Sequence, residues 1–448
     1  MRKESFSLTK RQSIDKILLQ GSLVSFAIKI GGVLSAFAVQ LFLARALDPK
    51  GFGDYVFVLT IVNFAVLLGS LGLDKAAVKF LPQYAADKTP ELATAFQQNA
   101  IKLTFVAGLF FSVALVVLPF YWQGLDDGLR NCLLLGAALI HCNLYIQWYS
   151  GVFQANRRVS LSAYPQSILR PLLVILLVAV ASLCLPVSGE MVVAVSVVSG
   201  FLVLAFMMLL SDRVERGPGI AVGLPWREWL EMAVPMMFIS GLNLIMSQAD
   251  IFMLGVMLDT ASAGIYSAAT RLALLVTFVL TSVNVIAAPL IAEMWAKRDL
   301  DGIQHIVSRT SAFSFFVAIC GCLFIFVFRD FFLALYGPEF LAARDALAML
   351  LAGQMLNAAV GCAGYVMIMT GHQRNSLIIL AMAAVVNVVL NIVLIPEMKI
   401  LGAAIATCVS TLVMCAMLAW YTNSIIGINS TFVRMSIFVA KTKSVGRL

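Results

Sequence analysis

Four charged residues lie deep inside long apolar stretches of the sequence, namely Lys29, Arg170, Asp250 and Arg271, while Lys102 and Arg309 lie near the ends of such stretches. A charge near the centre of a bilayer costs at least about 2.5–3.5 kcal/mol on insertion scales, so a charge kept there needs a partner or a function. Lysine and arginine bind anions, and arginine can hold a phosphate through two parallel hydrogen bonds. Lys29 and Arg170 lie in the first half of the chain, where no carboxylate occurs at comparable depth. The pattern therefore predicts a site for an anionic group such as a diphosphate.

Asp250 and Arg271 lie in the second half, at matching depths on neighbouring apolar segments. A structural ion pair is one interpretation of this placement. The other is functional: the pair breaks and reforms as a cavity opens, or Asp250 carries a coupling proton or sodium ion. Asn243 and Gln248 add polarity to the segment of Asp250 and are predicted to line the cavity.

The remaining candidates favour a structural explanation. His141 lies within an apolar segment, where a histidine is more often hydrogen-bonded in the core than a proton carrier. Asp74, Lys75 and Lys79 follow an apolar segment at its predicted cytoplasmic end. They could guide an anionic head group into a transport pathway, but a solvated loop face explains them more simply.

Composition places these residues in a membrane protein. The chain has 448 residues, of which 61% are hydrophobic and 12% charged, and its mean hydropathy is +0.96. Soluble domains are about half apolar and a quarter charged. Apolar runs of about 20 residues, long enough to span the hydrocarbon core, occur twelve times. We place them at 22–44, 55–73, 100–120, 131–151, 163–185, 191–210, 232–256, 264–292, 308–328, 346–370, 376–395 and 400–421.

The basic residues predict the orientation of these spans. The net charge of +8 could suggest nucleic acid, but the basic residues are spread over short loops instead of one face, so no nucleic-acid partner is expected. Of the 26 Lys and Arg residues outside the spans, 20 fall on the side of the N-terminus. The positive-inside rule therefore predicts that both termini are cytoplasmic. The terminal segments 1–21 and 423–448 are amphipathic enough to lie on the membrane surface, although solvated disordered tails explain them equally well.

The chain also contains an internal repeat. An ungapped shift of 211 positions brings together a Leu-Asp…Gly-x-Tyr turn from each half, and paired halves are common in transporters. The shift covers six spans, so the halves run in the same direction. It predicts two pseudo-symmetric six-helix bundles, 22–211 and 232–422, joined by a cytoplasmic linker at 212–231 and enclosing a central cavity. The coinciding residues include Leu43 with Leu254, Leu47 with Leu258, Asp48 with Asp259, Gly53 with Gly264, and Tyr55 with Tyr266.

The sequence offers no pattern for catalysis, metals or cofactors. The eight cysteines all lie in apolar segments, without a CxxC motif or Cys/His metal spacing. There is no Gly-rich GxxxxGK loop for ATP, no HExxH motif and no nucleophile elbow. We expect a transporter without catalytic residues, metal or cofactor.

Short motifs at the start of each half resemble a known family. ARALDPKGFGDY at 44–55 and GSLGLD at 69–74 are similar to the opening of the bacterial polysaccharide transporters, the O-antigen-type flippases. DIFMLG at 250–255 and AGIYSAATRL at 263–272 resemble the opening of that family's second half. These motifs mark turns and helix starts, so they are moderately specific.

The resemblance implies a function and a location. It implies an all-α protein that moves an undecaprenyl-diphosphate-linked oligosaccharide across the bacterial cytoplasmic (inner) membrane, for lipopolysaccharide or exopolysaccharide synthesis. A polysaccharide polymerase and glycosyltransferases are the partners it suggests. Basic cavity residues hold the diphosphate and acidic sugars in this family, and here that role falls to Lys29 and Arg170, with Arg271 behind them.

Two alternatives remain open at this stage. A drug or cation antiporter of the same superfamily would need a carboxylate in its cavity, and Asp250 is the one deep candidate. A membrane polysaccharide polymerase or ligase is less favoured, because the largest predicted outer loop has no obvious acid/base pair.

Overall fold

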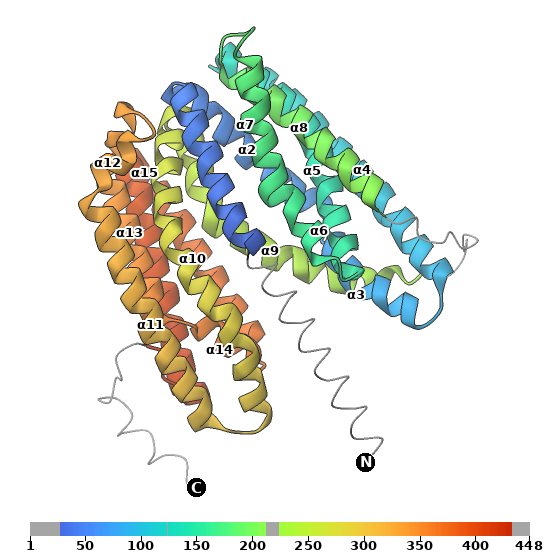
Figure 1. Cartoon of the computed structure of the whole chain (residues 1–448), viewed down its shortest axis with the longest axis vertical. Coiled ribbons are helices and arrows are strands. Elements are labelled where there is room, and N and C mark those ends of the chain that lie inside the picture. Colours follow the sequence, from blue (N-terminus) through green and yellow to red (C-terminus); the bar gives the residue numbers. More distant parts are fainter. Residues whose placement is uncertain (1–26, 123, 212–223, 432–448) are drawn as a thin grey trace. The chain divides into compact units, whose positions relative to one another are not determined.

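The structure is a computed structural model that describes residues 27–122, 124–211 and 224–431. Within these ranges every regular element is a helix (Figure 1). Contact clustering divides the chain into two compact units, Met1–Gly241 and Leu242–Leu448, and the division falls within one long helix, α9. The predicted interfacial segment 1–21, most of the linker and the end of the C-terminal tail lie outside the described residues.

The first unit consists of α-helices and one π-helical segment, η1. Its elements are the helix Ala27–Ala46, α2 (Pro49–Ser70), α3 (Leu73–Ala86), α4 (Pro90–Tyr121), α5 (Asp127–Ala155), α6 (Val159–Tyr164), η1 (Pro165–Leu169), α7 (Arg170–Ala181), α8 (Gly189–Leu210) and the first part of α9 (Trp226–Met257).

The second unit begins within α9 and is also helical throughout its described residues. Its further elements are α10 (Thr260–Ala296), α11 (Leu300–Val327), α12 (Arg329–Ala334), the 3₁₀ helix η2 (Pro338–Ala343), α13 (Arg344–Val360), α14 (Ala363–Met369), α15 (Gln373–Tyr421) and the π-helical η3 (Thr422–Ile426).

These helices confirm an all-helical, multi-pass membrane protein, but their number differs from the prediction. Ten of the described helices are long and apolar enough to cross a membrane, or eleven if α13 and α14, bent by 44°, form one span. Each of the twelve predicted runs lies largely in helix. The count is lower because the last two runs, 376–395 and 400–421, are merged in α15.

The helix α15 is in fact a hairpin of two helical arms. Lys399 interrupts it with non-helical backbone angles (φ 52°, ψ −130°). Asn387 Nδ2 donates to Thr407 Oγ1 over 3.4 Å although the residues are 20 positions apart, and a straight helix would separate them by about 30 Å. The two arms therefore lie side by side. Gly402 sits in this fold-back, where a Cβ atom would overlap the carbonyl oxygen of Leu394.

The internal repeat has a local structural cause. Asp48 is the N-cap of α2 and its Oδ1 accepts a hydrogen bond from the Gly51 amide at 2.8 Å. Asp259 is the N-cap of α10 and its Oδ1 accepts from the Ser262 amide at 2.7 Å. An N-cap aspartate satisfies amides that the first turn of a helix leaves unpaired. The repeated Leu-Asp turn thus starts an equivalent helix in each half.

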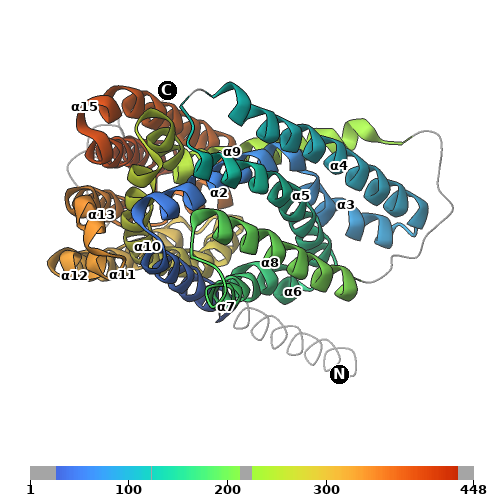
Figure 2. The same ribbon diagram turned by 90° about the horizontal axis from the view of Figure 1, so that it is seen from above.

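A central helix organises each unit. In the first unit α5 packs against α2, α3, α4 and α8, and Figure 2 shows it between α4 and α8. In the second unit α13 packs against α10, α11 and α15.

Asp126, the N-cap of α5, forms an ion pair with Lys50 at 3.2 Å. Burial acts to raise the pKa of Asp126, but hydrogen bonds from Lys50 and the Leu129 amide outweigh it and lower the pKa below its ordinary value.

The outer faces of several helices are apolar. Phe110 and Phe120 on α4 are 68% and 73% exposed, and Phe316 on α11 is 68% exposed. Large exposed apolar areas on a folded protein mark contact with a membrane or another apolar partner. With helices of spanning length, these faces are the ones expected to contact lipid.

We predict that Gly402→Ala destabilises the protein by about 1–3 kcal/mol, because the added methyl group forces the arms of α15 apart. Thermal unfolding of the purified protein in detergent would measure the effect. Gly364→Ala is the matched control, since nothing lies within 4 Å of a Cβ atom there. Equal unfolding temperatures for the two variants would contradict the hairpin.

Candidate functional site

Arg170 occupies an irregular part of the first unit. It is the first residue of α7 and directly follows the π-helical segment η1, which lies between Pro165 and Leu169. π-Helical turns inserted between α-helices are rare and are frequent at functional sites. Pro165 begins this segment and Pro171 follows Arg170. Neither proline can donate a backbone hydrogen bond, which makes the irregular turn easier to form.

The Arg170 side chain is half-buried between helices and contacts an uncharged partner. Its Nη1 donates to the side-chain oxygen of Asn143 on α5 at 2.8 Å. Its Nη2 lies 3.7 Å from the position that a Cβ atom on Gly200 of α8 would occupy. No carboxylate pairs with Arg170 among the residues described. Its positive charge is therefore not neutralised by a described ion pair.

The helix that carries Lys29 packs against the segment next to Arg170. A Cβ atom on Gly31 would lie 2.9 Å from Ile168, and one on Gly32 would lie 2.8 Å from Ser167. The two glycines thus let the helix Ala27–Ala46 approach η1 closely. Lys29 itself is exposed. The helix that carries Lys29 therefore touches the segment that directly precedes Arg170.

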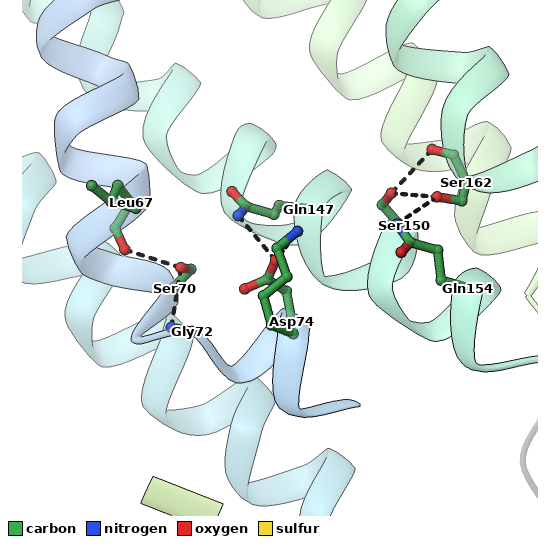
Figure 3. A network of polar contacts seen from close by, with 9 residues as sticks. Leu67, Ser70, Gly72, Asp74, Gln147, Ser150, Gln154 and Ser162 are labelled. Atoms are coloured by element: carbon green, nitrogen blue, oxygen red, sulfur yellow. Dashed lines mark hydrogen bonds and ion pairs between the residues drawn. The ribbon is translucent and has the colours of Figure 1, made fainter. Parts of the chain in front are cut away.

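The environment of Asp74 differs from the solvated loop face that the sequence predicts. Asp74 lies in the first turn of α3 and is only 3% exposed. Gln147 on α5 donates to its Oδ2 at 3.1 Å, as Figure 3 shows, and Lys75 pairs with the same oxygen at 3.1 Å. A Cβ atom on Gly151 would overlap the carbonyl oxygen of Asp74. Asp74 thus joins α3 to α5 inside the unit.

The two lysines near Asp74 are more accessible. Lys75 is half-buried beside Asp74, while Lys79 is exposed and lies 5.1 Å above the ring of Phe80. Figure 3 also shows a neighbouring polar group in which Ser150 and Gln154 of α5 contact Ser162 of α6. Both networks join helices, and their role in guiding a head group stays a prediction.

His141 is half-buried and hydrogen-bonded. Its Nδ1 lies 3.1 Å from Ser112 Oγ, and the ring of Phe105 packs edge-on against it. Ser112 Oγ also donates to the carbonyl oxygen of Ala137 at 2.9 Å. These contacts agree with a structural histidine that joins α4 to α5.

The second unit contains a buried carboxylate with four donors. Asp250 on α9 is 8% exposed. Its Oδ1 accepts from Asn387 at 3.1 Å and from Asn391 at 2.6 Å. Its Oδ2 accepts from the Tyr266 hydroxyl at 2.7 Å and from the hydroxyl of Thr407. An ionised carboxylate can accept at both oxygens, so it can use all four donors at once.

Arg271, the residue predicted from the sequence to pair with Asp250, is not one of these four donors. All four are uncharged, whereas Arg271 has an exposed side chain on α10. The donors come from α10 and from both arms of α15. The polar network around Asp250 therefore holds the α15 hairpin against α9 and α10.

Asp250 and Tyr266 also border a cavity of about 450 Å³ within the second unit. The predicted residue Asn243 lines this cavity, whereas Gln248 is not among its lining residues. Much of the remaining wall is polar but uncharged. The lining side chains with hydroxyl or amide groups are Ser247, Thr270, Thr277, Thr281, Asn284, Gln354, Asn357, Tyr365 and Thr407.

The sequence analysis missed most of these polar residues. Asn387 and Asn391 are four positions apart within an apolar run, so they share one face of a helix. Polar groups in a spanning helix are costly unless they find a partner, and this spacing was the available signal. Tyr266 was noticed only as part of the repeat.

Comparisons with known proteins agree with the fold and the absence of a catalytic constellation. A family model described as "Polysaccharide biosynthesis protein" matches residues 18–295, and the model "MatE" matches 235–393. Two solved structures of transporters have the same fold. They are "Lipid II flippase MurJ, inward closed conformation" (TM-score 0.72, 12% identity, 91% of this chain and 88% of that chain) and an inward-facing multidrug resistance MATE family transporter of the MOP superfamily (TM-score 0.70, 13% identity, 89% and 96%).

A curated relative is the "probable low-salt glycan biosynthesis flippase Agl15" of Haloferax volcanii. It is 26% identical over 187 residues, which is 41% of this chain and 39% of the relative. The chain thus matches only about two-fifths of that relative's length.

These findings define an all-helical, multi-pass membrane protein with the fold of these two solved transporters. Because the first model covers more than half of its length, the chain belongs to the polysaccharide biosynthesis protein family.

We predict that Asp250→Asn destabilises the protein. The substitution replaces one carboxylate oxygen with an NH₂ group, which cannot accept the hydrogen bonds that the neighbouring groups donate. The expected loss is about 1.5–3 kcal/mol for each hydrogen bond to a charged group that is lost. Chemical or thermal unfolding in detergent would measure it. Asp345→Asn, at an exposed position on α13, is the control and should change stability little. A wild-type unfolding midpoint for Asp250→Asn would refute this account of the network.

Proposed function

We propose that the protein is a flippase for a lipid-linked glycan, specifically an undecaprenyl-diphosphate-linked oligosaccharide. Membership of the polysaccharide biosynthesis family supports this proposal. So does the similarity to a relative named as a probable glycan biosynthesis flippase, and the fold shared with a lipid II flippase. The product of such transport would be a surface polysaccharide such as lipopolysaccharide or exopolysaccharide.

The observation that carries the proposal is the environment of Arg170. A guanidinium enclosed among helices normally has a carboxylate partner, because an unpaired buried charge is costly. Here its described hydrogen bond is to the neutral amide of Asn143, and Lys29 stands on the helix that packs against the adjoining segment. A diphosphate would supply the missing negative charge. Arg271, exposed on α10, is a further cation for acidic groups of the substrate.

The proposed mechanism is alternating access, in which the two bundles rock and expose the substrate to one side of the membrane at a time. The diphosphate is held near Lys29 and Arg170, the polyprenyl chain stays in the bilayer, and the sugars cross through the polar interior. The bacterial cytoplasmic membrane, with both termini in the cytoplasm, is the proposed location. Glycosyltransferases and a polysaccharide polymerase would supply and consume the glycan.

Asp250 is the proposed site of ion coupling. Its carboxylate accepts hydrogen bonds from the amide nitrogens of Asn387 and Asn391 and from the hydroxyl of Thr407. The carboxylate and hydroxyl oxygens are ligands of the kind that hard cations prefer. Asn391 Oδ1 is buried and accepts no hydrogen bond from a described residue. A sodium ion or a proton bound here would alter how the arms of α15 are held against α9.

A drug or cation antiporter is the second candidate. The match to the MatE model and the presence of a carboxylate at a cavity favour it. Against it, both oxygens of Asp250 already accept hydrogen bonds, so little of its charge is left to attract an organic cation. A polymerase or ligase is not proposed, because the family and fold are those of transporters.

We predict that Lys29→Ala and Arg170→Ala each reduce flipping at least tenfold, because each removes a positive charge that would hold the diphosphate. Surface polysaccharide restored in a flippase-deficient strain, at matched expression, would measure this. Lys102→Ala, which removes an exposed lysine from α4, is the control and should restore polysaccharide fully. Full restoration by both test variants would reject the diphosphate role.

We also predict that Asp250→Asn removes the response of flipping to an ion gradient. Proteoliposomes with an imposed sodium or proton gradient would be assayed below the unfolding temperature of the variant. The wild type and Asp345→Asn should flip faster with one of the two gradients. Equal stimulation of Asp250→Asn would exclude coupling through this carboxylate.

A further inference from the structure

Four amide side chains line the cavity of the second unit, and three of them, all except Asn243 of α9, lie on α10 and α13. Asn284 belongs to α10, while Gln354 and Asn357 are three positions apart on α13 and so lie on one face of that helix. The cavity measures about 450 Å³, within the range of about 300–1,000 Å³ typical of small-molecule sites. The three amides are therefore placed to contact the same occupant.

None of these three amides has a hydrogen-bond partner among the described residues. Asn284 is only 6% exposed, and its Oδ1 is fully buried without a donor. Buried side-chain amides are nearly always hydrogen-bonded, so an unpartnered one at a cavity wall indicates a ligand or water. By contrast, the amides of Asn387 and Asn391 in the same unit are directed to Asp250.

Several hydroxyl groups of the wall already donate a hydrogen bond within their own helix. Thr270 donates to the carbonyl oxygen of Tyr266 at 3.0 Å, and Thr277 donates to that of Leu274 at 2.7 Å. Their protons stay on their own helix, and only their lone pairs are available to an occupant. The three amides and the Tyr365 hydroxyl are the lining groups without a described partner that can both donate and accept.

The charge of the wall restricts what the cavity can hold. Asp250 is the one charged side chain among its described lining residues. With no cation there, a phosphate or carboxylate group would be poorly held. Because the two Asp250 oxygens already accept four hydrogen bonds, an organic cation would gain little binding energy from this carboxylate. An uncharged occupant with many hydroxyl or acetamido groups fits best.

We propose that this cavity binds uncharged sugar residues of the transported glycan, through Asn284, Gln354 and Asn357. Each amide can donate to one sugar oxygen and accept from a neighbouring hydroxyl or acetamido group. This inference rests on the proposed function. It adds that different parts of the substrate bind to different units. The diphosphate binds the cations of the first unit, and the neutral sugars bind the amides of the second unit.

The test compares two probes with the purified full-length protein in nanodiscs. One probe is undecaprenyl diphosphate, and the other is undecaprenyl diphosphate carrying two N-acetylglucosamine residues. The wild type should bind the sugar-bearing probe at least about tenfold more tightly, the effect of one or more net hydrogen bonds. Asn284→Leu and the double variant Gln354→Leu/Asn357→Leu should lose this preference and still bind undecaprenyl diphosphate normally.

Two controls accompany these variants. Thr277→Val changes the same wall at a hydroxyl that is already bonded to its own helix, and it should keep the preference. Arg170→Ala should weaken the binding of both probes by the same factor, because this substitution affects the diphosphate site alone. The double variant replaces half-buried residues, so it guards against misfolding of the deeply buried Asn284 variant.

The outcomes separate the two proposals. If the wild type has no preference for the sugar-bearing probe, or if the leucine variants keep it, the sugar site is wrong while the flippase proposal stands. If the wild type binds neither probe, both proposals fail. If tetraphenylphosphonium displaces the sugar-bearing probe from the wild type and the leucine variants no longer bind it, the cavity takes organic cations and the sugar site is rejected.

Discussion

A carboxylate among apolar helices must have its oxygen atoms hydrogen-bonded, and this constraint organises the second unit around Asp250. Its four donors belong to α10 and to both arms of α15. Asn387 and Thr407 can reach the same carboxylate only because α15 folds back at Lys399. That fold-back in turn needs a residue without a side chain at Gly402. One polar interaction and one close backbone approach therefore determine how four helical segments pack.

The first unit satisfies its polar groups differently. Asp74 is buried against Gln147 and Lys75, and the glycines Gly31, Gly32 and Gly151 allow neighbouring helical segments to pack closely. Arg170 remains without a described carboxylate, whereas the cavity of the second unit is lined by neutral amides, among them the buried Asn284, whose Oδ1 has no described donor. The two units thus offer two chemistries, one suited to an anion and the other to hydroxyl groups. A lipid-linked glycan contains both.

The MurJ and MATE structures named above share only 12% and 13% identity with the chain. Such a fold persists because it depends on apolar periodicity, helix caps and small residues at close contacts, which many sequences provide. Transport chemistry depends on a few polar side chains, which can change while the helices stay. The substrate must therefore be argued from groups such as Arg170 and the three cavity amides, and the fold alone does not identify it.

The sequence by itself determined the class of protein, the approximate helices and the repeat, because each depends on neighbouring residues. Runs of about 20 apolar residues are local features, and so are Asp48 and Asp259, which cap their helices only three residues away. Lys29, Arg170 and Asp250 stood out because a charge in an apolar run is visible without a structure. Only the tertiary structure decided what these residues touch. From the sequence, an ion pair with Arg271 was one interpretation of Asp250. Its donors Asn387, Asn391 and Thr407 lie 137, 141 and 157 positions away in the chain, and Asp74 is buried where a solvated loop face was expected. No local pattern specifies such distant contacts, because they arise when helices pack and each buried polar group takes the nearest available partner.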